Sequence, residues 1–151
     1  MIPSLKSDIR RGESADLPAV VELLKGAGLP TADLTSAVRL QMWVLDVRDS
    51  PQGVVALERF GSEGLLRSLA IARKYRQRGF GRELVLRLEH DAQADGVEQL
   101  VLLTETAQPF FRALGYDVID RDYVSKELAQ SAEFRFLCPA SAVCMSKALH
   151  S

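Results

Sequence analysis

Arginines and glycines crowd the stretch RKYRQRGFGRELV, residues 73–85, immediately before an apolar pattern of helical spacing. Arg76, Arg78 and Arg82 carry forked N–H donors that suit phosphate oxygens. Gly79 and Gly81 have no Cβ, so an anion can approach the backbone closely. The first N–H groups of a helix are unpaired and carry partial positive charge. The stretch therefore predicts a pyrophosphate site, with solvated arginines in a simple turn as the alternative, because short glycine motifs are weakly specific.

The elements that must position this turn alternate between strand and helix patterns. Helices are predicted over residues 17–28, 31–40, 107–115 and 122–134, and the clearest one runs from Phe80 to near Gly96. The sequence SPQG, residues 50–53, is predicted to join the second and third strands as a hairpin turn. The strands are predicted over residues 5–12, 41–49, 53–61, 65–72, 98–104, 116–120 and 141–149. This order predicts a mixed α/β fold with one central sheet, in a single domain over residues 1–151.

The composition limits the function classes. Nineteen basic and twenty acidic residues give a net charge of −1, so no general affinity for nucleic acid is expected and any positive site must be local. No uncharged apolar run approaches the ~18 residues of a membrane span, and the N-terminus lacks the apolar core of a signal peptide. Two cysteines are too few for a disulfide scaffold. We therefore expect a cytoplasmic protein without membrane or nucleic-acid partners.

Two motifs together resemble the GNAT N-acetyltransferase superfamily. Residues 69–85, LAIARKYRQRGFGRELV, resemble its coenzyme A motif, [QR]-x-x-G-x-[GA] after a strand, with Arg76, Gly79 and Gly81 at the defining positions. Residues 110–116, FFRALGY, resemble its F-Y-x-x-x-G-[FY] signature, and the order of elements agrees over nearly the whole chain. The resemblance implies a mostly antiparallel, twisted sheet of about seven strands, splayed in the middle and flanked by about four helices. It also implies acetyl-CoA as acetyl donor, a small-molecule amine as acceptor, and a homodimer. No metal is expected, because the spacing of the two cysteines matches no usual zinc site and the two histidines form no cluster.

The resemblance assigns residues to the cofactor. The pantetheine arm would pair with the backbone of Leu69, Ala70 and Ile71, as an added strand pairs with a sheet edge, and a main-chain N–H there would polarise the thioester carbonyl. The pyrophosphate would lie on the backbone of Arg76, Gln77, Arg78, Gly79, Phe80, Gly81 and Arg82. Transfer would be direct, within a ternary complex, because no cysteine lies near the predicted thioester.

The sequence departs from the superfamily at two positions. Phe111, still assigned to the cofactor site, replaces the tyrosine that usually protonates the departing thiolate, and Thr104, assigned to the substrate site, replaces an asparagine. A thiol of pKa ~8.5 is a good leaving group, so the missing hydroxyl is predicted to cost little. Tyr116, Thr106 or a water could act instead. The alternative is a non-catalytic acyl-CoA-binding regulatory or sensor domain.

Three charged residues are candidates for the acceptor side. Glu58 and Glu105 are candidate general bases, because the attacking amine must lose a proton; a solvated surface carboxylate is the alternative for each. Arg67 interrupts an apolar run and shares strand parity with Leu69 and Ile71. A buried arginine needs an anionic partner. That partner is either the acid group of an amino-acid-like acceptor or, within the protein, a carboxylate such as Glu58.

A narrower resemblance concerns the phrases LLRSLAIA, LLTETAQPFFRALGY and AEFRFLCPASAVCM, which resemble N-acetyltransferases found with bacterial arsenic-resistance genes. The second phrase is also similar to acetylglutamate-synthase acetyltransferase domains. This resemblance implies a detoxifying role on an amino-acid-like toxin with an acidic or arsenic-bearing group. Cys138 and Cys144 could bind trivalent arsenic as soft thiolates, or could simply pack as small apolar residues.

Overall fold

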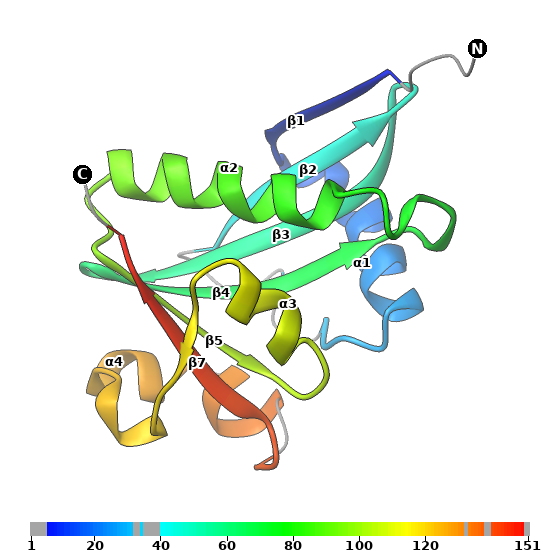
Figure 1. Cartoon of the computed structure of the whole chain (residues 1–151). Helices are drawn as coiled ribbons and strands as arrows, with labels where there is room; N and C mark the ends of the chain where they lie inside the picture. The colour runs from blue at the N-terminus through cyan, green and yellow to red at the C-terminus, as the bar shows by residue number, and fades with distance from the viewer. Residues whose placement is uncertain (1–5, 32–33, 35–39, 132, 138–139, 150–151) are drawn as a thin grey trace.

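Seven strands form one sheet in the order β1-β2-β3-β4-β5-β7-β6, seen in Figure 1. The structure is a computed structural model that describes residues 6–31, 34, 40–131, 133–137 and 140–149. The strands are β1 (Ser7–Arg11), β2 (Leu40–Val47), β3 (Ser50–Phe60), β4 (Glu63–Ile71), β5 (Gln99–Thr104), β6 (Asp117–Val118) and β7 (Val143–Ala148). The helices are α1 (Leu17–Gly26), α2 (Phe80–Ala94), α3 (Gln108–Ala113) and α4 (Lys126–Ala129), with shorter helical turns over 14–16, 73–75, 121–123 and 133–137.

The sheet is antiparallel except between its two central strands. β4 and β5 run parallel, and they pair only where Glu63–Leu65 face Gln99–Val101. Beyond those three pairs the strands diverge, as Figure 1 shows, while β4 stays paired with β3 and β5 stays paired with β7. The predicted mixed α/β class and the splayed, mostly antiparallel sheet are confirmed.

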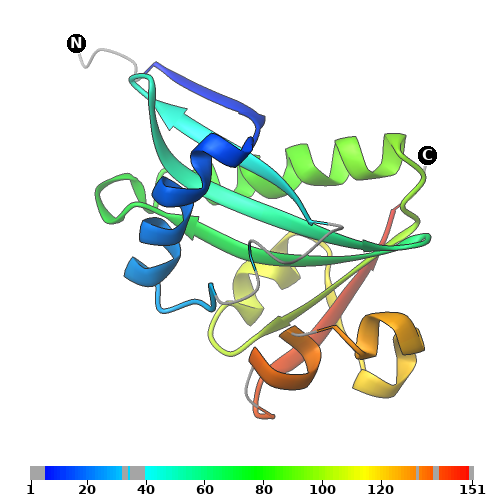
Figure 2. The ribbon, with the colours of Figure 1, turned by 180° about the vertical axis from the view of Figure 1, so that it is seen from behind.

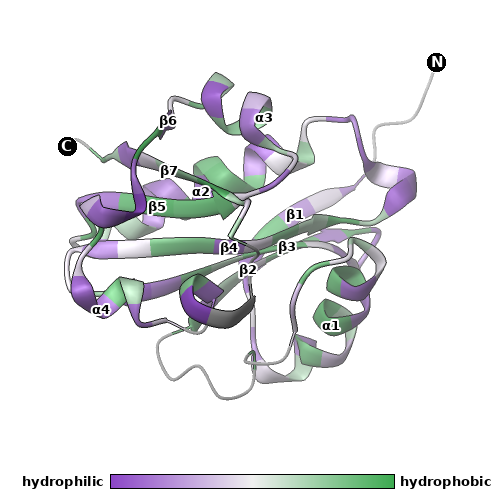
Figure 3. Ribbon diagram, turned by 90° about the horizontal axis from the view of Figure 1, so that it is seen from below, coloured by the Kyte–Doolittle hydropathy of each residue, from purple (hydrophilic) through white to green (hydrophobic). Residues whose placement is uncertain are grey.

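The helices cover both faces of the sheet. The larger core cluster packs α2 and α3 against one face, and it includes the predicted α2 stripe of Phe80, Leu84, Leu88 and Ala92. On the other face α1 covers the β1–β4 half and α4 covers the β5–β7 half. Figure 2 shows α1 lying across that second face, and in Figure 3 α1 and α2 stand on opposite sides of the strands. In the described ranges no helix is long and apolar enough to cross a bilayer.

The start of α1 is stabilised by a partly buried charge cluster. Asp16 accepts a hydrogen bond from the Glu13 N–H at 2.7 Å and two from the Arg10 guanidinium at 2.8 and 2.9 Å. Arg10 also donates to Asp46 of β2 at 2.7 Å, so one side chain ties β1, β2 and the helix together. These bonds, chiefly the two from Arg10, hold the pKa of Asp16 below its ordinary value of 3.8.

Some predicted boundaries are wrong. The β2–β3 hairpin turns at Arg48 and Asp49, both left-handed (φ 53° and 63°), whereas SPQG was predicted as the turn and instead begins β3. The helix predicted over residues 122–134 is broken, because Ser125 is extended and starts α4 by accepting from the Leu128 N–H. The helix predicted over 31–40 falls largely outside the described residues.

Candidate active site

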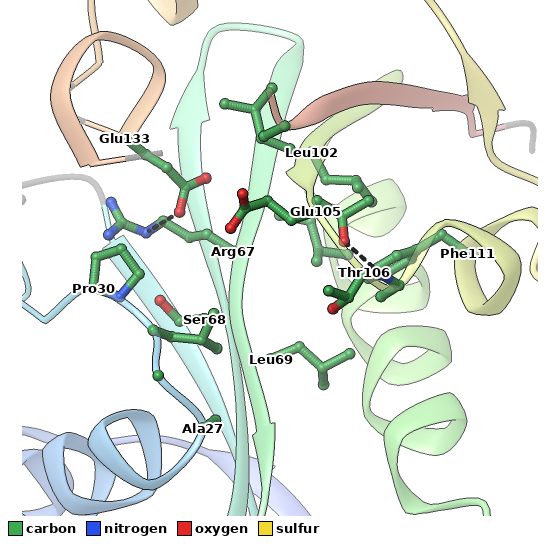
Figure 4. Close-up of a pocket in the computed structure, with 17 residues that line it drawn as sticks. Ala27, Pro30, Arg67, Ser68, Leu69, Leu102, Glu105, Thr106, Phe111 and Glu133 are labelled. Carbon is green, nitrogen blue, oxygen red and sulfur yellow. Dashed lines mark hydrogen bonds and ion pairs between the residues drawn. The ribbon is translucent and has the colours of Figure 1, made fainter. Parts of the chain in front are cut away.

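The divergence of β4 from β5 leaves a cavity of about 750 Å³ in the middle of the sheet. One wall is the second half of β4 and the other is the end of β5 with the turn that follows it (Figure 4). The lining residues are Ala27, Gly28, Leu29, Pro30, Leu66, Arg67, Ser68, Leu69, Leu102, Leu103, Thr104, Glu105, Thr106, Ala107, Phe111, Glu133 and Ala142. Main-chain groups of β4 beyond Leu65 and of β5 beyond Val101 therefore border a space wide enough for an extended ligand.

A β-bulge shapes the β4 wall. Ala70 lies opposite Val54 and Arg67 opposite Ala56, so two β4 residues, Ser68 and Leu69, face a single residue of β3. Ser68 is left-handed (φ 61°), the conformation of the first residue in one common bulge type. The bulge re-aims the backbone of Ser68 and Leu69 at the point where the cavity opens.

The bulge also corrects the predicted strand parity of Arg67. Leu69 and Ile71 pack with Leu66 in the cluster under α2. Arg67 points to the opposite face, where it meets Glu58, whose own cross-strand partner is Leu65 of the α4-side cluster. Simple alternation would have put Arg67 on the face of Leu69, and the extra residue at the bulge reverses it.

The glycine turn between β4 and α2 presents bare backbone amides. No backbone bond outside the helical ladder occupies the N–H groups of residues 77–82. Gln77 and Gly79 are both left-handed (φ 63° and 85°). Successive amides next to left-handed residues can form a concavity that suits an anion. A Cβ on Gly79 would meet nothing within 4 Å, so this side of the turn is open. The predicted pyrophosphate residues are thus brought together on one exposed turn.

The arginines of the turn have specific contacts. Arg76 Nε donates to the carbonyl of Ile71 at 2.8 Å, which ties the turn back to the end of β4. The Arg78 guanidinium lies 5.7 Å from the centre of the Tyr75 ring, and Arg82 is exposed. The arginine of the coenzyme A motif therefore has a structural contact as well as a charge. Of the predicted cofactor residues, Leu69 and Phe111 line the cavity, while Ala70, Ile71 and residues 76–82 lie beyond its lining.

Arg67 is held by two carboxylates. Its Nη1 donates to Glu58 Oε1 at 3.3 Å, and its Nε lies 3.4 Å from Glu133 Oε1, an ion pair without hydrogen-bond geometry. The side chain of Arg67 is 0% exposed, and Glu58 retains 14% exposure. The ion pair with Glu58 that the sequence raised as an alternative is present. Glu58 reaches the site only through Arg67, because it does not line the cavity.

Glu105 and the threonines lie on the β5 side. Glu105 is exposed, lines the cavity and accepts from the Ser141 hydroxyl at 3.2 Å. Thr104 accepts from the Ala107 N–H at 3.0 Å and so fixes the turn that leads into α3. Thr106 lines the cavity and is exposed. Of the two predicted general bases, the structure brings only Glu105 into the cavity.

Phe111 and Tyr116 stand in different environments. Phe111 lines the cavity from α3 and meets the Tyr116 ring edge-on at 5.4 Å. Tyr116 is fully buried, and its hydroxyl donates to Glu89 Oε2 at 2.8 Å. Burial, the Glu89 charge and this bond raise the Tyr116 pKa well above its usual range. These contacts favour Thr106 or a water over Tyr116 as the proton donor to the thiolate, because the Tyr116 hydroxyl donates to Glu89 and does not line the cavity.

Of the two cysteines, the structure describes only Cys144. Cys144 is buried in β7, and burial raises the pKa of its thiol to about 11, so the thiol stays protonated at neutral pH. Cys138 lies outside the described residues, so the proposed pair of thiolates is not tested. Among the described residues no group of three or more metal-ligating side chains gathers.

The sequence reasoning missed two parts of the site. Glu133 lies in the π-helical turn 133–137, and the segment Ala27–Pro30 follows α1. Glu133 resembles any other charged residue in a helical pattern, and its partner Arg67 lies far away in the sequence. The one available signal was Arg67 itself, whose burial requires an anion.

The chain matches known acetyltransferases. The acetyltransferase (GNAT) domain family matches residues 39–118, more than half of the chain. An uncharacterized N-acetyltransferase of Chlorobaculum tepidum is 25% identical over 134 residues, which are 84% of this chain and 86% of that protein.

Solved structures share the fold. The N-acetylglutamate synthase of Neisseria gonorrhoeae, complexed with coenzyme A and N-acetyl-glutamate, superposes with a TM-score of 0.81 at 18% identity. That match covers 99% of this chain but 36% of the synthase, so the chain spans about a third of that protein. A Mycobacterium tuberculosis protein in complex with CoA matches with a TM-score of 0.79 at 23% identity, over 95% of this chain and 99% of its own.

The family match, the splayed sheet and the exposed glycine turn all agree with a GNAT acetyltransferase domain. The chain belongs to the acetyltransferase (GNAT) family and is an acyl-CoA N-acyltransferase.

Proposed function

We propose that this protein transfers the acetyl group of acetyl-CoA to the primary amine of a small acceptor bound in the cavity between β4 and β5. The observation that carries the proposal is the separation of these strands after three paired residues, directly beside the bulge at Ser68. The pantetheine arm would bond to the unpaired edge of β4 as an added strand, and the pyrophosphate would lie on the amides of residues 77–82.

The reaction needs three events. The amine nitrogen attacks the thioester carbonyl carbon, the carbon–sulfur bond breaks, and the amine proton leaves while the thiolate of CoA gains one. The re-aimed N–H of Leu69 would stabilise the negative charge on the carbonyl oxygen. Glu105 is the candidate that accepts the amine proton, directly or through water. Because a thiolate leaves readily, water or Thr106 would suffice where Phe111 provides no hydroxyl.

Glu58 has a different proposed role. Since it contacts Arg67 rather than the cavity, we assign it to positioning the Arg67 side chain and the β4 wall. Thr104 likewise holds the turn that carries Glu105.

The acceptor suggested by the sequence resemblance is an amino-acid-like molecule with an acidic or arsenic-bearing group, gripped by Arg67. The N-acetyl-glutamate of the gonococcal synthase complex is in keeping with an amino-acid acceptor. The contacts of Arg67 give less support to an acidic group on the acceptor, because Arg67 already forms ion pairs with Glu58 and Glu133. Such an acceptor would have to replace one of these carboxylates.

A second candidate, a non-catalytic acyl-CoA sensor, is motivated by Phe111. The two functions are separated by calorimetric titration with CoA beside a thiol-release assay over amines, amino acids and their phosphinic and arsinic analogues. Release of CoA with at least one acceptor supports the enzyme. Tight binding of CoA without release across the panel would favour the sensor, and a ping-pong product-inhibition pattern would exclude direct transfer.

A further inference from the structure

Ser141 and Glu105 meet at the end of the β5–β7 ladder that borders the cavity. Thr104 and Val143 form the last residue pair of this antiparallel ladder. The residues just beyond that pair, Glu105 after β5 and Ala142 before β7, both line the cavity. The register of the two strands therefore brings the segment before β7 alongside the candidate general base.

The contact between these two side chains holds one oxygen of Glu105. The Ser141 hydroxyl donates to Glu105 Oε1 at 3.2 Å, and among the described residues it is the only donor to this carboxylate. Without such a bond, an exposed glutamate exchanges among several rotamers. The second oxygen, Oε2, stays available for a proton, and Figure 4 shows the Glu105 carboxylate directed into the cavity.

Arg121 holds the backbone on both sides of Ser141. Its Nη2 donates to the carbonyl of Ala142 at 2.7 Å and to that of Ala140 at 3.4 Å. Its guanidinium also lies 5.8 Å from the centre of the Phe134 ring. Arg121 belongs to the helical turn after β6, so it ties that turn to the segment before β7. The position of the Ser141 hydroxyl therefore depends on Arg121.

We propose that Ser141 is a positioning residue that orients Glu105 for proton transfer, and that Arg121 holds Ser141 in place. This inference rests on the proposed acetyltransferase function and extends it to two residues that do not line the cavity. As the carbon–nitrogen bond forms and the carbon–sulfur bond breaks, the amine proton passes to Glu105 Oε2. The bond from Ser141 to Oε1 keeps the carboxylate aimed at the amine during this step.

The test is a double-mutant cycle between Ser141 and Glu105. The kcat and KM are measured with the acceptor that releases CoA fastest in the panel of amines and amino acids. Ser141→Ala should lower kcat about threefold to tenfold, the factor that corresponds to one net hydrogen bond. The KM for acetyl-CoA should stay the same, because the turn before α2 is unchanged. Ser141→Thr retains the hydroxyl and should keep kcat within about twofold of the wild type.

In the Glu105→Gln background, neither Ser141→Ala nor Arg121→Met should lower kcat further, because both act through the carboxylate. The matched controls are Ser50→Ala, an exposed serine bonded to the Gln52 side chain, and Arg112→Met, an exposed arginine of α3. Both controls should leave kcat unchanged, and thermal unfolding verifies that every variant folds. Wild-type kcat in Ser141→Ala would overturn the inference, as would an equal loss with and without the Glu105 carboxylate.

A structural readout separates this inference from the proposed function. If no acceptor of the panel releases CoA, acetyl transfer is in doubt, but crystal structures of the wild type and of Ser141→Ala still test the positioning. We expect the Glu105 side chain in one conformation in the wild type, bonded to Ser141, and in several conformations in Ser141→Ala. A Glu105 side chain that keeps its position without the hydroxyl would overturn the inference.

Discussion

Substituting Gly79 tests whether the turn before α2 is the pyrophosphate site. Gly79 is the N-cap of α2 and has a left-handed backbone, φ 85° and ψ 1°. A Cβ there would meet no atom within 4 Å, so Gly79→Ala introduces no clash and its cost is purely conformational. The left-handed region costs an L-residue about 1–2 kcal/mol, partly offset by the lower entropy of unfolded alanine.

The expected loss of stability is therefore about 1 kcal/mol. For a chain of this size, 1 kcal/mol corresponds to a fall in Tm of about 2–4 °C. To accommodate alanine at residue 79, the backbone of the turn must relax away from φ 85°. This change moves the amides of residues 77–82 out of their shared concavity. We expect the Kd for CoA to rise at least tenfold, measured by calorimetry beside thermal unfolding without ligand.

Two further variants make the comparison specific. Gly79→Asn should fall between wild type and alanine in both measurements, because asparagine tolerates the left-handed region. In Gly81→Ala the new Cβ would lie 3.5 Å from Phe110 Cζ, an ordinary contact, so Tm should stay the same or rise. Wild-type Tm in Gly79→Ala would refute the strain argument, and a lower Tm with unchanged CoA affinity would refute the assignment of the turn.

Three more substitutions test other contacts. Phe111→Tyr should raise kcat by no more than about 100-fold, the low end of general-acid assistance, and a larger gain in steady-state assays would show that thiolate protonation limits the wild type. Tyr116→Phe should lower the free energy of unfolding by about 1–3 kcal/mol in urea, because buried Glu89 loses a donor, yet leave the pH profile of kcat unchanged. Asp16→Asn should flatten the acid limb of a curve of unfolding free energy against pH. Because the pKa of Asp16 is lowered in the folded state, its stabilising effect is complete above the ordinary pKa of 3.8. That effect is lost as the pH falls below 3.8 toward the folded pKa. A wild-type acid limb in Asp16→Asn would contradict the ion pair with Arg10.

Local patterns predicted much of the fold. The spacing of Phe80, Leu84, Leu88 and Ala92 identified the buried stripe of α2, because helix periodicity depends only on neighbouring residues. The hairpin turn was predicted two residues too late in the sequence. Arg48 and Asp49 form the turn in left-handed conformations, for which glycine or asparagine is the usual sequence signal.

The candidate active site was harder to predict from local sequence patterns. The glycine turn could be found because backbone freedom and charge are visible in the residue types. The bulge at Ser68 has no local signature, and it reversed the face assigned to Arg67. Glu133 could not be linked to Arg67 without the fold, because strand geometry and the loop after α4 bring them together.

The short pairing between β4 and β5 has a consequence for the empty protein. Each strand leaves main-chain donors and acceptors facing the gap, so the sheet has two open edges in its interior in addition to the rim edges at β1 and β6. Open edges can recruit strands from other chains. Acetyl-CoA or CoA bound in the gap would cover these two edges and so reduce aggregation. The solubility of the protein on heating should therefore improve with CoA even when no acceptor is present.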